Sequence, residues 1–542
     1  MIKRIELILS PKESHDDSFI SELTRKKLSL KKSDKLHIVK IRRSIDARSK
    51  SPRVNLLINA YVNELPKEQP EIKSFYHKVT SNKKVIIIGA GPAGYFAALE
   101  LIENGIKPII FDRGKDARTR RKDLRAIQQF SIVNHDSNYC FGEGGAGTYS
   151  DGKLYTRSHK RGDIDKALKI LVEHGANSEI LIEAHPHIGS NKLPGVVQKI
   201  RESILEFGGE IHFDSKVTDF IIGNNSIKGV IVNDKEEHLS DAVILATGHS
   251  ARDIFFLCSK RNIHIEAKPF AIGVRAEHPQ AMIDEIQYRQ KIRDKFLPAS
   301  SYKLVTQVNE RGVFSFCMCP GGLIVPAATA PNELVVNGMS MSRRDSKFAN
   351  SGIVVAIETE DFKKILAEIN IEEVNEVKDY FKKEYNVNEL SEEFDGLLIQ
   401  SIIEKRFFDA SGKETQQAPA QKVTDFVNGR VSSILNDTSY IPGVYSYNLE
   451  NLLPKFFSER LKQGFIDFGK KMRGYFSDEG MMIGAESRTS SPIKIPRNKI
   501  DYQHIKVSNL YPCGEGAGYA GGIISAALDG QNVAKAIASK IK

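Results

Sequence analysis

The amino-acid sequence predicts an α/β protein in which a parallel sheet, covered on both faces, carries an inserted α+β domain and follows a small N-terminal α/β module. Residues 83–114 read as an apolar run, a glycine turn, an Ala- and Leu-rich helix and a second apolar run, and neither run alternates with polar residues. Residues 508–542 repeat the order of apolar strand, glycine turn and Ala-rich helix. A chain of 542 residues is also too long for one hydrophobic core, so two or three domains are expected.

The N-terminal module is expected to span residues 1–66. Its alternating and helical patterns predict a strand, a helix and two further strands, at residues 2–9, 17–30, 36–42 and 54–62. Residues 67–82 are polar and contain Pro70, so they are the expected linker to the main body.

The rest of the chain divides into a sheet domain and an insertion. Helices are expected at 163–174 and 193–207, with strands at 211–213, 217–222, 227–232 and 242–246. Alternating segments that predict an antiparallel sheet lie at 271–275, 304–308, 312–318 and 334–339, before a mostly helical stretch at 355–408. The sheet domain is therefore expected at 83–270 and 476–542, and the insertion at 271–475.

Composition excludes several classes of protein. The chain is 41% apolar and 27% charged, as in ordinary globular proteins. It has no apolar stretch of roughly 18 residues, and its first residues lack the apolar core of a signal peptide, so we expect a cytoplasmic protein without membrane contact. The five cysteines form no CxxC pair, so neither a disulfide framework nor a metal site is expected; they are Cys140, Cys258, Cys317, Cys319 and Cys513.

Positive charge is concentrated in two segments. The formal net charge is 78 − 68 = +10. Residues 1–50 carry 14 Lys and Arg against 7 Asp and Glu, and residues 113–125 carry 7 against 2. Such segments attract polyanions, although the alternative interpretation is a solvated face that keeps the protein in solution.

A glycine motif follows the first apolar run of the sheet domain. Gly89, Gly91 and Gly94 form G-x-G-x-x-G between a strand and a helix that begins near Pro92 and Ala93. These glycines allow a tight turn, close approach of a pyrophosphate and close packing of helix on strand, while the helix N-terminus attracts the phosphates. Asp112 ends the next strand, 18 residues after Gly94, where its carboxylate can accept the ribose hydroxyls; Arg113 follows it. The motif predicts a dinucleotide site.

Two further segments resemble the two-dinucleotide-binding-domain flavoprotein superfamily. They are LATG at 245–248 and LYPCGEGAGYAGG at 510–522. The resemblance implies that the first motif holds the ADP half of FAD and that Glu515 contacts the ribityl or pyrophosphate region. It also implies that the last helix points its N-terminus at the flavin N1–C2=O edge. The FAD-binding residues expected from these segments and their neighbours are Val217, Ala246, Thr247, Gly248, Gly514, Glu515, Gly516, Gly522 and Ile523.

Nearly the whole chain resembles a bacterial family of uncharacterised FAD-dependent dehydrogenases. The segments that carry this resemblance are RRSIDAR (42–48), GEGGAGTYSDGKL (142–154), CMCPGG (317–322), ESRTSSP (486–492) and GEGAGYAGGIISAALDG (514–530). It implies a Rossmann-like FAD-binding domain at 83–270 and 476–542 and a substrate domain between them, and it leaves the reaction open. We find no second G-x-G-x-x-G between 248 and 508, so NAD(P)H, if used, would dock transiently on the flavin face.

The glycine-rich loop before residue 150 is a second candidate contact to FAD. Its backbone N–H groups would line the flavin or the pyrophosphate, or else its glycines serve only a turn that needs positive φ. The loop residues concerned are Gly144, Gly145, Ala146, Gly147 and Thr148. Ser150 and Asp151 are positioned to bond the ribityl chain.

Cys317 and Cys319 are candidate redox residues. On an extended strand their side chains share a face and lie roughly 6–7 Å apart at Cα, slightly too far for a relaxed disulfide. Either they are buried packing residues, or they relay electrons between the flavin and a disulfide substrate. The Pro320-Gly321-Gly322 turn that follows would let a planar ring approach.

Glu486 and Arg488 form a polar cluster before the last strand. Arg488 would anchor a substrate carboxylate or phosphate, or else the two side chains form a structural ion pair. His249 is interpreted as a loop histidine rather than a general base. The arginines of RRSIDAR either bind an acidic partner or dock the N-terminal module onto the main body.

These features predict an FAD-dependent oxidoreductase that exchanges a hydride or two electrons between flavin N5 and a small-molecule substrate. Two alternatives remain at this point. One is an FAD-dependent tRNA-modifying enzyme, which would make nucleic acid a partner. The other is a non-enzymatic FAD-binding or sensing protein whose N-terminal module binds another protein. The sequence does not predict the oligomeric state.

Overall fold

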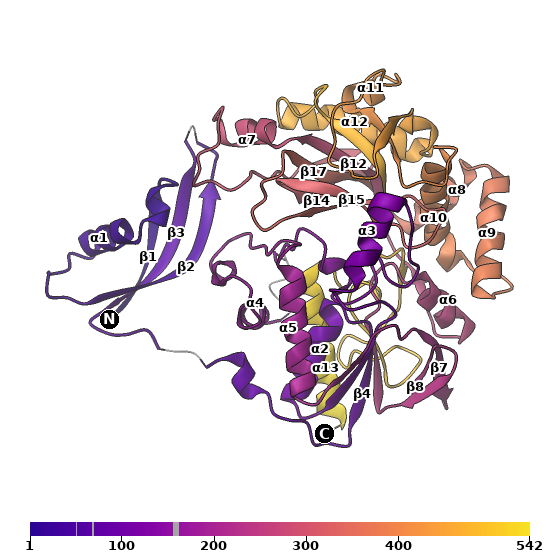
Figure 1. The fold of residues 1–542 in the computed structure, drawn as a ribbon, viewed down its shortest axis with the longest axis horizontal. Helices are drawn as coiled ribbons and strands as arrows, with labels where there is room; N and C mark the ends of the chain where they lie inside the picture. The colour runs from indigo at the N-terminus through magenta and orange to yellow at the C-terminus, as the bar shows by residue number, and fades with distance from the viewer. Residues whose placement is uncertain (50, 68–69, 156–161, 542) are drawn as a thin grey trace.

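The computed structural model describes residues 1–49, 51–67, 70–155 and 162–541. Figure 1 shows a small N-terminal sheet beside a larger body built around two main sheets. Residues 68–69 of the expected linker and residue 542 of the expected C-terminal part lie outside the described residues. Among the described residues, no helix has both the length and the apolarity needed to cross a membrane.

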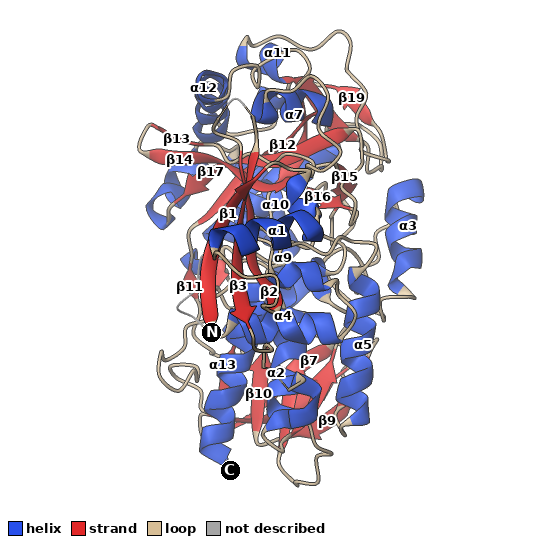
Figure 2. Cartoon of the chain, turned by 90° about the vertical axis from the view of Figure 1, so that its left-hand side faces the viewer, coloured by secondary structure: helices blue, strands red, loops and turns tan. Residues whose placement is uncertain are grey.

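The N-terminal module is an antiparallel sheet in the order β1-β3-β2, with one helix on its side (Figure 2). Alternate residues of β3 are buried, as the predicted strand pattern requires. Leu7, Leu56 and Ile58 of the sheet pack with Ile20 of the helix. The elements are β1 (Ile2–Leu9), α1 (Asp17–Lys27), β2 (Leu36–Asp46) and β3 (Arg53–Val62).

Arg43 on β2 joins the module to the main body. Its backbone N–H donates to the carbonyl of Ile182 at 2.7 Å, and its own carbonyl accepts the N–H of Ala184 at 2.9 Å. Its guanidinium pairs with Glu179 at 2.5 Å and with Glu183. For Arg43, these contacts agree with the alternative in which the arginines of RRSIDAR dock the N-terminal module onto the main body.

The central sheet of the body is parallel and has the order β22-β10-β4-β5-β6. Its strands come from both ends of the body, so the last part of the chain completes a sheet that begins at Lys84. Ile87 and Ile110 are fully buried, as expected for strands covered on both faces. The strands are β4 (Lys84–Ile88), β5 (Lys107–Phe111), β6 (Glu210–His212), β10 (Ala242–Leu245) and β22 (Leu510–Pro512).

Helices cover one face of this sheet and a second sheet covers the other. Figure 1 shows α2, α5 and α13 side by side, with β7 and β8 beyond β4. The helices are α2 (Pro92–Glu103), α4 (Ile164–Glu173), α5 (Leu193–Glu206) and α13 (Ile523–Ile541). The covering antiparallel strands are β7 (Val217–Gly223), β8 (Ser226–Val232) and β9 (Glu236–Leu239). This architecture confirms the predicted α/β class with a Rossmann-like domain.

The inserted domain is built on a seven-stranded sheet in the order β13-β14-β17-β12-β20-β18-β19. Its strands are β12 (Phe270–Pro279), β13 (Val305–Val308), β14 (Arg311–Cys319), β17 (Phe348–Ile357), β18 (Ala418–Lys422), β19 (Val444–Ser446) and β20 (Met481–Glu486), and the hairpin beside it is β15 (Gly322–Pro326) and β16 (Val336–Ser340). Its helices are α7 (Gln280–Tyr288), α8 (Phe362–Ala367), α9 (Ile371–Tyr385), α10 (Asp395–Asp409), α11 (Val423–Val427) and α12 (Lys455–Lys471). Two more helices, α3 (Arg120–Phe130) and α6 (Arg252–Lys260), lie in the flanking segments.

The chain returns from the insertion later than the sequence predicts. The expected boundary is 475/476, but β20 pairs with β12 and β18 inside the seven-stranded sheet. Its buried apolar residues need partners on both sides, and only that sheet provides them. The return follows at β21 (Ile493–Lys494), which pairs with β11 (Glu266–Ala267).

We expect Arg43→Glu to loosen the N-terminal module without unfolding the body. The substitution replaces attraction to Glu179 and Glu183 by repulsion, and each partly exposed pair contributes on the order of 0.5–1 kcal/mol. Hydrogen exchange at the amides of Arg43 and Ala184 should accelerate at least about fivefold. The matched control is Arg48→Glu, because Arg48 is 90% exposed and pairs with Asp46 of its own segment. Equal exchange in the two variants would contradict this docking contact.

Candidate functional site

A cavity of about 370 Å³ lies where the carboxyl ends of the parallel strands face the inserted domain. Most of the residues predicted to bind FAD line it: Gly89, Gly91, Pro92, Ala93, Asp112, Arg113, Gly145, Ala146, Gly147, Val217, Ala246, Thr247, Gly248, Gly514, Glu515, Gly522 and Ile523. The other predicted residues, Gly94, Gly144, Thr148 and Gly516, are not part of the lining. Of the four predicted catalytic residues, Cys317 and Arg488 reach the cavity, and Cys319 and Glu486 do not.

The glycine turn between β4 and α2 has the geometry of a phosphate cradle. Gly89 has φ +106°, and a Cβ there would lie 2.5 Å from the carbonyl oxygen of Ala246. A Cβ on Gly94 would lie 2.1 Å from the carbonyl oxygen of Gly89, so only glycine lets α2 start this close to the strand. A Cβ on Gly91 would meet no atom within 4 Å. Gly91 N-caps α2 without a side-chain hydrogen bond, so the helix N-terminus is open toward the cavity.

Asp112 is held by the backbone at the end of β5. Its Oδ2 accepts the N–H of Ala90 and its Oδ1 accepts the N–H of Gly114, both at 2.8 Å. A carboxylate has further lone pairs, so the predicted ribose contact remains compatible with this geometry. Arg113 pairs with Asp136 and Asp253 and lies over the ring of Phe141, so its guanidinium is positioned by protein groups.

The glycine-rich loop divides between the two predicted roles. Gly144 has φ +76° and donates its N–H to the carbonyl of Ala90 at 2.8 Å, which is a structural role. The hydroxyl of Thr148 donates to the carbonyl of Glu143 at 3.0 Å. Residues 145–147 line the cavity, with backbone groups available to a ligand. Gly144 and Thr148 therefore serve the conformation of the loop. That residues 145–147 contact FAD stays a prediction.

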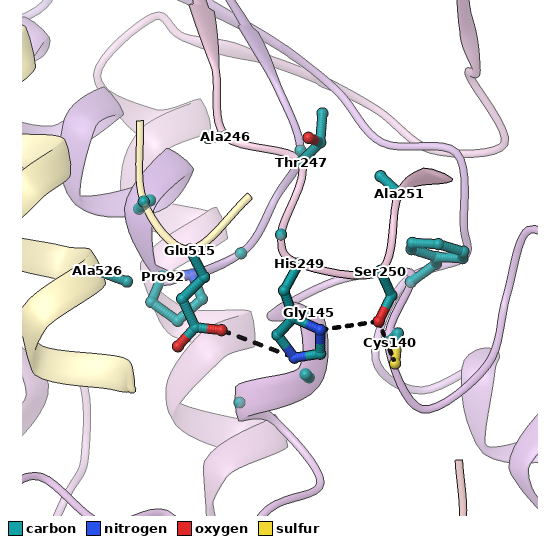
Figure 3. A pocket seen from close by; sticks show the side chains of 18 of the residues that line it. Pro92, Cys140, Gly145, Ala246, Thr247, His249, Ser250, Ala251, Glu515 and Ala526 are labelled. Atoms are coloured by element: carbon teal, nitrogen blue, oxygen red, sulfur yellow. Dashed lines mark hydrogen bonds and ion pairs between the residues drawn. The ribbon is translucent and has the colours of Figure 1, made fainter. Parts of the chain in front are cut away.

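A polar chain crosses the cavity wall below the LATG segment (Figure 3). Nε2 of His249 lies 3.8 Å from a carboxylate oxygen of Glu515, and its Nδ1 lies 2.9 Å from the hydroxyl of Ser250. That hydroxyl lies 3.4 Å from the sulfur of Cys140. Burial lowers the pKa of His249 below its usual value, although Glu515 opposes this shift. His249 was interpreted from the sequence as a loop histidine; it lines the cavity, and its partner Glu515 comes from 266 residues further along the chain.

Comparison with known proteins places this site in a family. Residues 82–127, which contain the glycine turn and Asp112, match a family described as an FAD binding domain. Residues 269–489 match "FAD-dependent protein, C-terminal domain-like", and residues 1–61 match a domain of unknown function. An uncharacterised protein of Clostridium beijerinckii is 38% identical over 536 residues, which cover 95% of each chain.

The chain belongs to the same family as this uncharacterised clostridial protein. Solved structures are more distant: CtdE in complex with FAD and substrate 4 is 13% identical with a TM-score of 0.32, over 84% of this chain and 80% of that one. Glycine oxidase from Bacillus cereus is also 13% identical, with a TM-score of 0.29 over 85% and 96% of the two chains. FAD is therefore the cofactor on the evidence of the family match, and the turn, the open helix end and Asp112 fit its dinucleotide part.

In this FAD-dependent protein the cysteine pair does not lie on a regular strand. The register of β14 against β17 shifts between Phe316 and Cys319, and Cys317 has φ +44°, so the strand bulges at the first cysteine. The Sγ of Cys319 lies 3.2 Å from the carbonyl oxygen of Cys317. The regular extended strand that we expected is therefore interrupted at Cys317 by this bulge.

Arg275 on β12 anchors this bulge from behind. It is fully buried and donates to the carbonyl of Cys317 at 2.7 Å, to Glu486 at 2.8 Å and to Asn350 at 2.8 Å. Glycine at position 338 leaves room for it, since a Cβ there would lie 2.1 Å from its Nη2. Burial raises the pKa of the Glu486 carboxyl to about 7, although Arg275 opposes this shift. Arg275 was not predicted, because its partners come from distant strands.

The predicted alternatives for Glu486 and Arg488 need correction. Glu486 pairs with Arg275, whereas Arg488 pairs with Glu333 at 2.6 Å and with Glu404 at 2.9 Å. The two side chains therefore have separate partners, and the ion pair between them that their spacing suggested is not formed. Arg488 borders the cavity, but its buried charge is already matched by two carboxylates, so it is poorly placed to anchor a substrate anion.

Lys153 is a further cavity residue that the sequence did not single out. Its Nζ lies 3.8 Å from the sulfur of Cys317, 3.9 Å from that of Cys319 and 3.6 Å from Asp151. It lies two residues after Asp151 in the GEGGAGTYSDGKL segment, and only the fold brings it to the cysteines. Among the described residues, His, Cys, Asp and Glu side chains form no group of three or more that would hold a metal ion.

We expect Gly91→Ala to weaken FAD binding and leave the apoprotein stable. The new Cβ meets no protein atom within 4 Å, so the melting temperature of the FAD-free protein should not change, whereas a pyrophosphate against the turn would clash and FAD affinity should fall at least about tenfold. Fluorescence titration of the apoprotein with FAD measures the loss.

Two variants control this experiment. Gly94→Ala should lower the stability of the protein itself, because its Cβ collides with the backbone of Gly89. Gly195→Ala on α5, where a Cβ also has no neighbour within 4 Å, should leave FAD affinity unchanged and raise the melting temperature slightly, because alanine favours the helix. Normal FAD affinity in Gly91→Ala would place the pyrophosphate elsewhere.

Proposed function

We propose that this protein is an oxidoreductase that exchanges a hydride or an electron pair between the flavin of FAD and a small substrate. The observation that carries the proposal is a single cavity lined both by the dinucleotide turn and by Phe316, Cys317 and Asn337 of the inserted domain. Ligand sites concentrate where domains meet, and a cofactor domain facing a second domain gives a substrate access to the cofactor. The inserted domain would then provide the substrate side of the site.

The chain's own residues would bind and orient the reactants, while FAD when bound supplies the redox chemistry. The open N-terminus of α2 and the N–H groups of residues 145–147 would hold the phosphates, and Asp112 the ribose. Gly522 immediately precedes the last helix, and Glu515 accepts its N–H. The partial positive charge of that helix end would stabilise negative charge on the pyrimidine side of the flavin.

His249 is the candidate for proton transfer in this scheme. Because burial lowers its pKa, its imidazole is neutral in neutral solution and can accept a proton at Nε2, beside Glu515. The proton would then be shared with a carboxylate at the cavity wall. His249 would thus take part in proton transfer because the fold places it beside Glu515.

The RNA-modifying alternative rests in part on the basic segments, and in one of them several charges have partners within the protein. In the segment 113–125, Arg113 pairs with Asp136 and Asp253, and Lys115 pairs with Asp123. Arg120 is fully buried and donates to backbone carbonyls of residues 138–145. Much of this positive charge therefore serves the fold, which leaves a weaker basic surface for a polyanion than the sequence suggested.

We expect the bound flavin to be reduced by NADH or NADPH in an anaerobic stopped-flow experiment. Saturable bleaching of the flavin absorbance by one nicotinamide would support transient docking at the flavin face. Slow reduction by both, together with full reduction by dithionite, would indicate that the electrons come from another substrate. A flavin that no reductant bleaches and no acceptor reoxidises would overturn the proposed oxidoreductase activity.

A further inference from the structure

Cys317 and Cys319 differ from the protein's packing cysteines in what surrounds them. Cys258 is fully buried in an apolar environment, which raises the pKa of its thiol to about 12. Cys317 borders the cavity, and both it and Cys319 lie within 4 Å of the ammonium of Lys153. Arg275 adds a second cation, 3.6 Å from the sulfur of Cys319. Two thiols with two cations are the setting of reactive rather than inert cysteines.

We propose that Cys317 and Cys319 form a redox-active dithiol that exchanges an electron pair with FAD and that acts on small disulfides, or on the corresponding thiols in the reverse direction. The inference rests on the proposed oxidoreductase function and names its substrate class. Cys317, which reaches the cavity, is the attacking residue, and the fully buried Cys319 is the resolving one.

The bulge in β14 makes a bridge between the two residues possible. In a regular strand, residues two apart lie too far from each other for an unstrained disulfide. At the bulge the Cys319 thiol turns back and donates to the Cys317 carbonyl at 3.2 Å, and both sulfurs lie within 4 Å of the ammonium of Lys153. The hydrogen bond from Arg275 to that carbonyl holds the unusual backbone in place. A positive φ at a residue other than glycine is costly, and such strain is often retained at functional sites.

The local charges favour a thiolate on Cys317. The neighbouring Cys319 thiol lowers the pKa of the Cys317 thiol, and Lys153 and Arg275 lower it further against the effect of burial. Asp151 raises it, but Asp151 also pairs with Arg344, which offsets part of its charge. Glu486 is the other nearby acid, and Arg275 pairs with it. The net result is a nucleophilic sulfur facing the cavity.

The chemistry balances with FAD as the electron acceptor or donor. The Cys317 thiolate attacks one sulfur of a small disulfide, forms a mixed disulfide and releases the first thiolate. Cys319 then loses its proton and attacks the Cys317 sulfur, which releases the second thiolate and leaves a Cys317–Cys319 disulfide. Bound FAD in its reduced form would supply the electron pair, and solvent the protons, that break this disulfide and restore the dithiol. In sum, one substrate disulfide becomes two thiols while one reduced FAD is oxidised.

The first test counts electrons and thiols in the holoprotein. Oxidised protein should consume one electron pair for FAD and a second pair for the disulfide in an anaerobic dithionite titration. Alkylation followed by mass spectrometry should label Cys317 and Cys319 after the titration and not before it. Cys317→Ser should consume only the pair for FAD, and so should Cys319→Ser. Cys140→Ser is the labelling control, because Cys140 also lines the cavity but contacts Ser250 rather than a lysine.

The second test traps the intermediate. Cys319→Ser treated with hydroxyethyl disulfide should accumulate a mixed disulfide on Cys317, whereas Cys317→Ser should not form one. Wild-type protein that takes up a single electron pair and keeps both thiols labelled in every state would overturn the dithiol. If the same protein still has its flavin reduced by a nicotinamide and reoxidised by an acceptor without thiols, the proposed oxidoreductase function stands. If the flavin takes up no electrons, the proposed function itself fails.

Lys153→Met tests the electrostatic part by a pH profile. Removing the ammonium should raise the pKa of Cys317, so that more of the thiolate is protonated at a given low pH. Alkylation of the holoprotein, with its cysteines reduced, should therefore slow by about tenfold at pH 6. Lys153→Arg should retain most of the wild-type rate. An unchanged profile in Lys153→Met would show that the lysine does not support the thiolate and would remove the charge argument from the proposal.

Discussion

The cofactor cleft depends on backbone packed directly against backbone. A Cβ on Gly94 would lie 2.1 Å from the carbonyl oxygen of Gly89, and a Cβ on Gly530 would lie 2.1 Å from that of Ala93. The first contact lets α2 begin close against the sheet. The second lets α13 pack directly on the first turn of α2. Because no side chain separates these segments, the N-termini of two helices converge on one cavity. The positive ends of the helices, the glycine-rich loop and Glu515 all take their places from this close approach.

A buried arginine has a comparable part in the inserted domain. Arg275 on β12 reaches Cys317 on β14, Asn350 on β17 and Glu486 on β20, and so ties four strands of one sheet together behind the cavity. A buried guanidinium is costly unless every direction is matched, so these partners specify how the strands and the bulge align. The same constraint delivers the cysteine pair to the cavity wall. The chemistry we propose for that pair therefore depends on a charge that touches neither solvent nor substrate.

Local patterns predicted the parts of this protein whose reasons are local. The glycine motif, the apolar runs around it and the alternating strand β3 follow from short-range sterics and burial, and the structure places them as expected. The boundary at 475/476 was misplaced because the apolar run of β20 does not show which sheet it joins, and its pairing with β12 and β18 assigns it to the insertion. The roles of Lys153 and His249 could not be predicted from the residues around them, because their partners Cys317 and Glu515 lie 164 and 266 residues further along the chain.

By itself, the sequence determined the α/β class, the dinucleotide turn and, through resemblance, FAD as the cofactor, because a phosphate cradle is encoded within a few adjacent residues. Tertiary structure alone decided which charges face which sulfurs. It paired Glu486 with Arg275 rather than with Arg488, bent β14 at Cys317 and brought Lys153 to the bend. These are contacts between segments far apart in the chain, and their energies depend on burial and distance, which no local pattern of residues records.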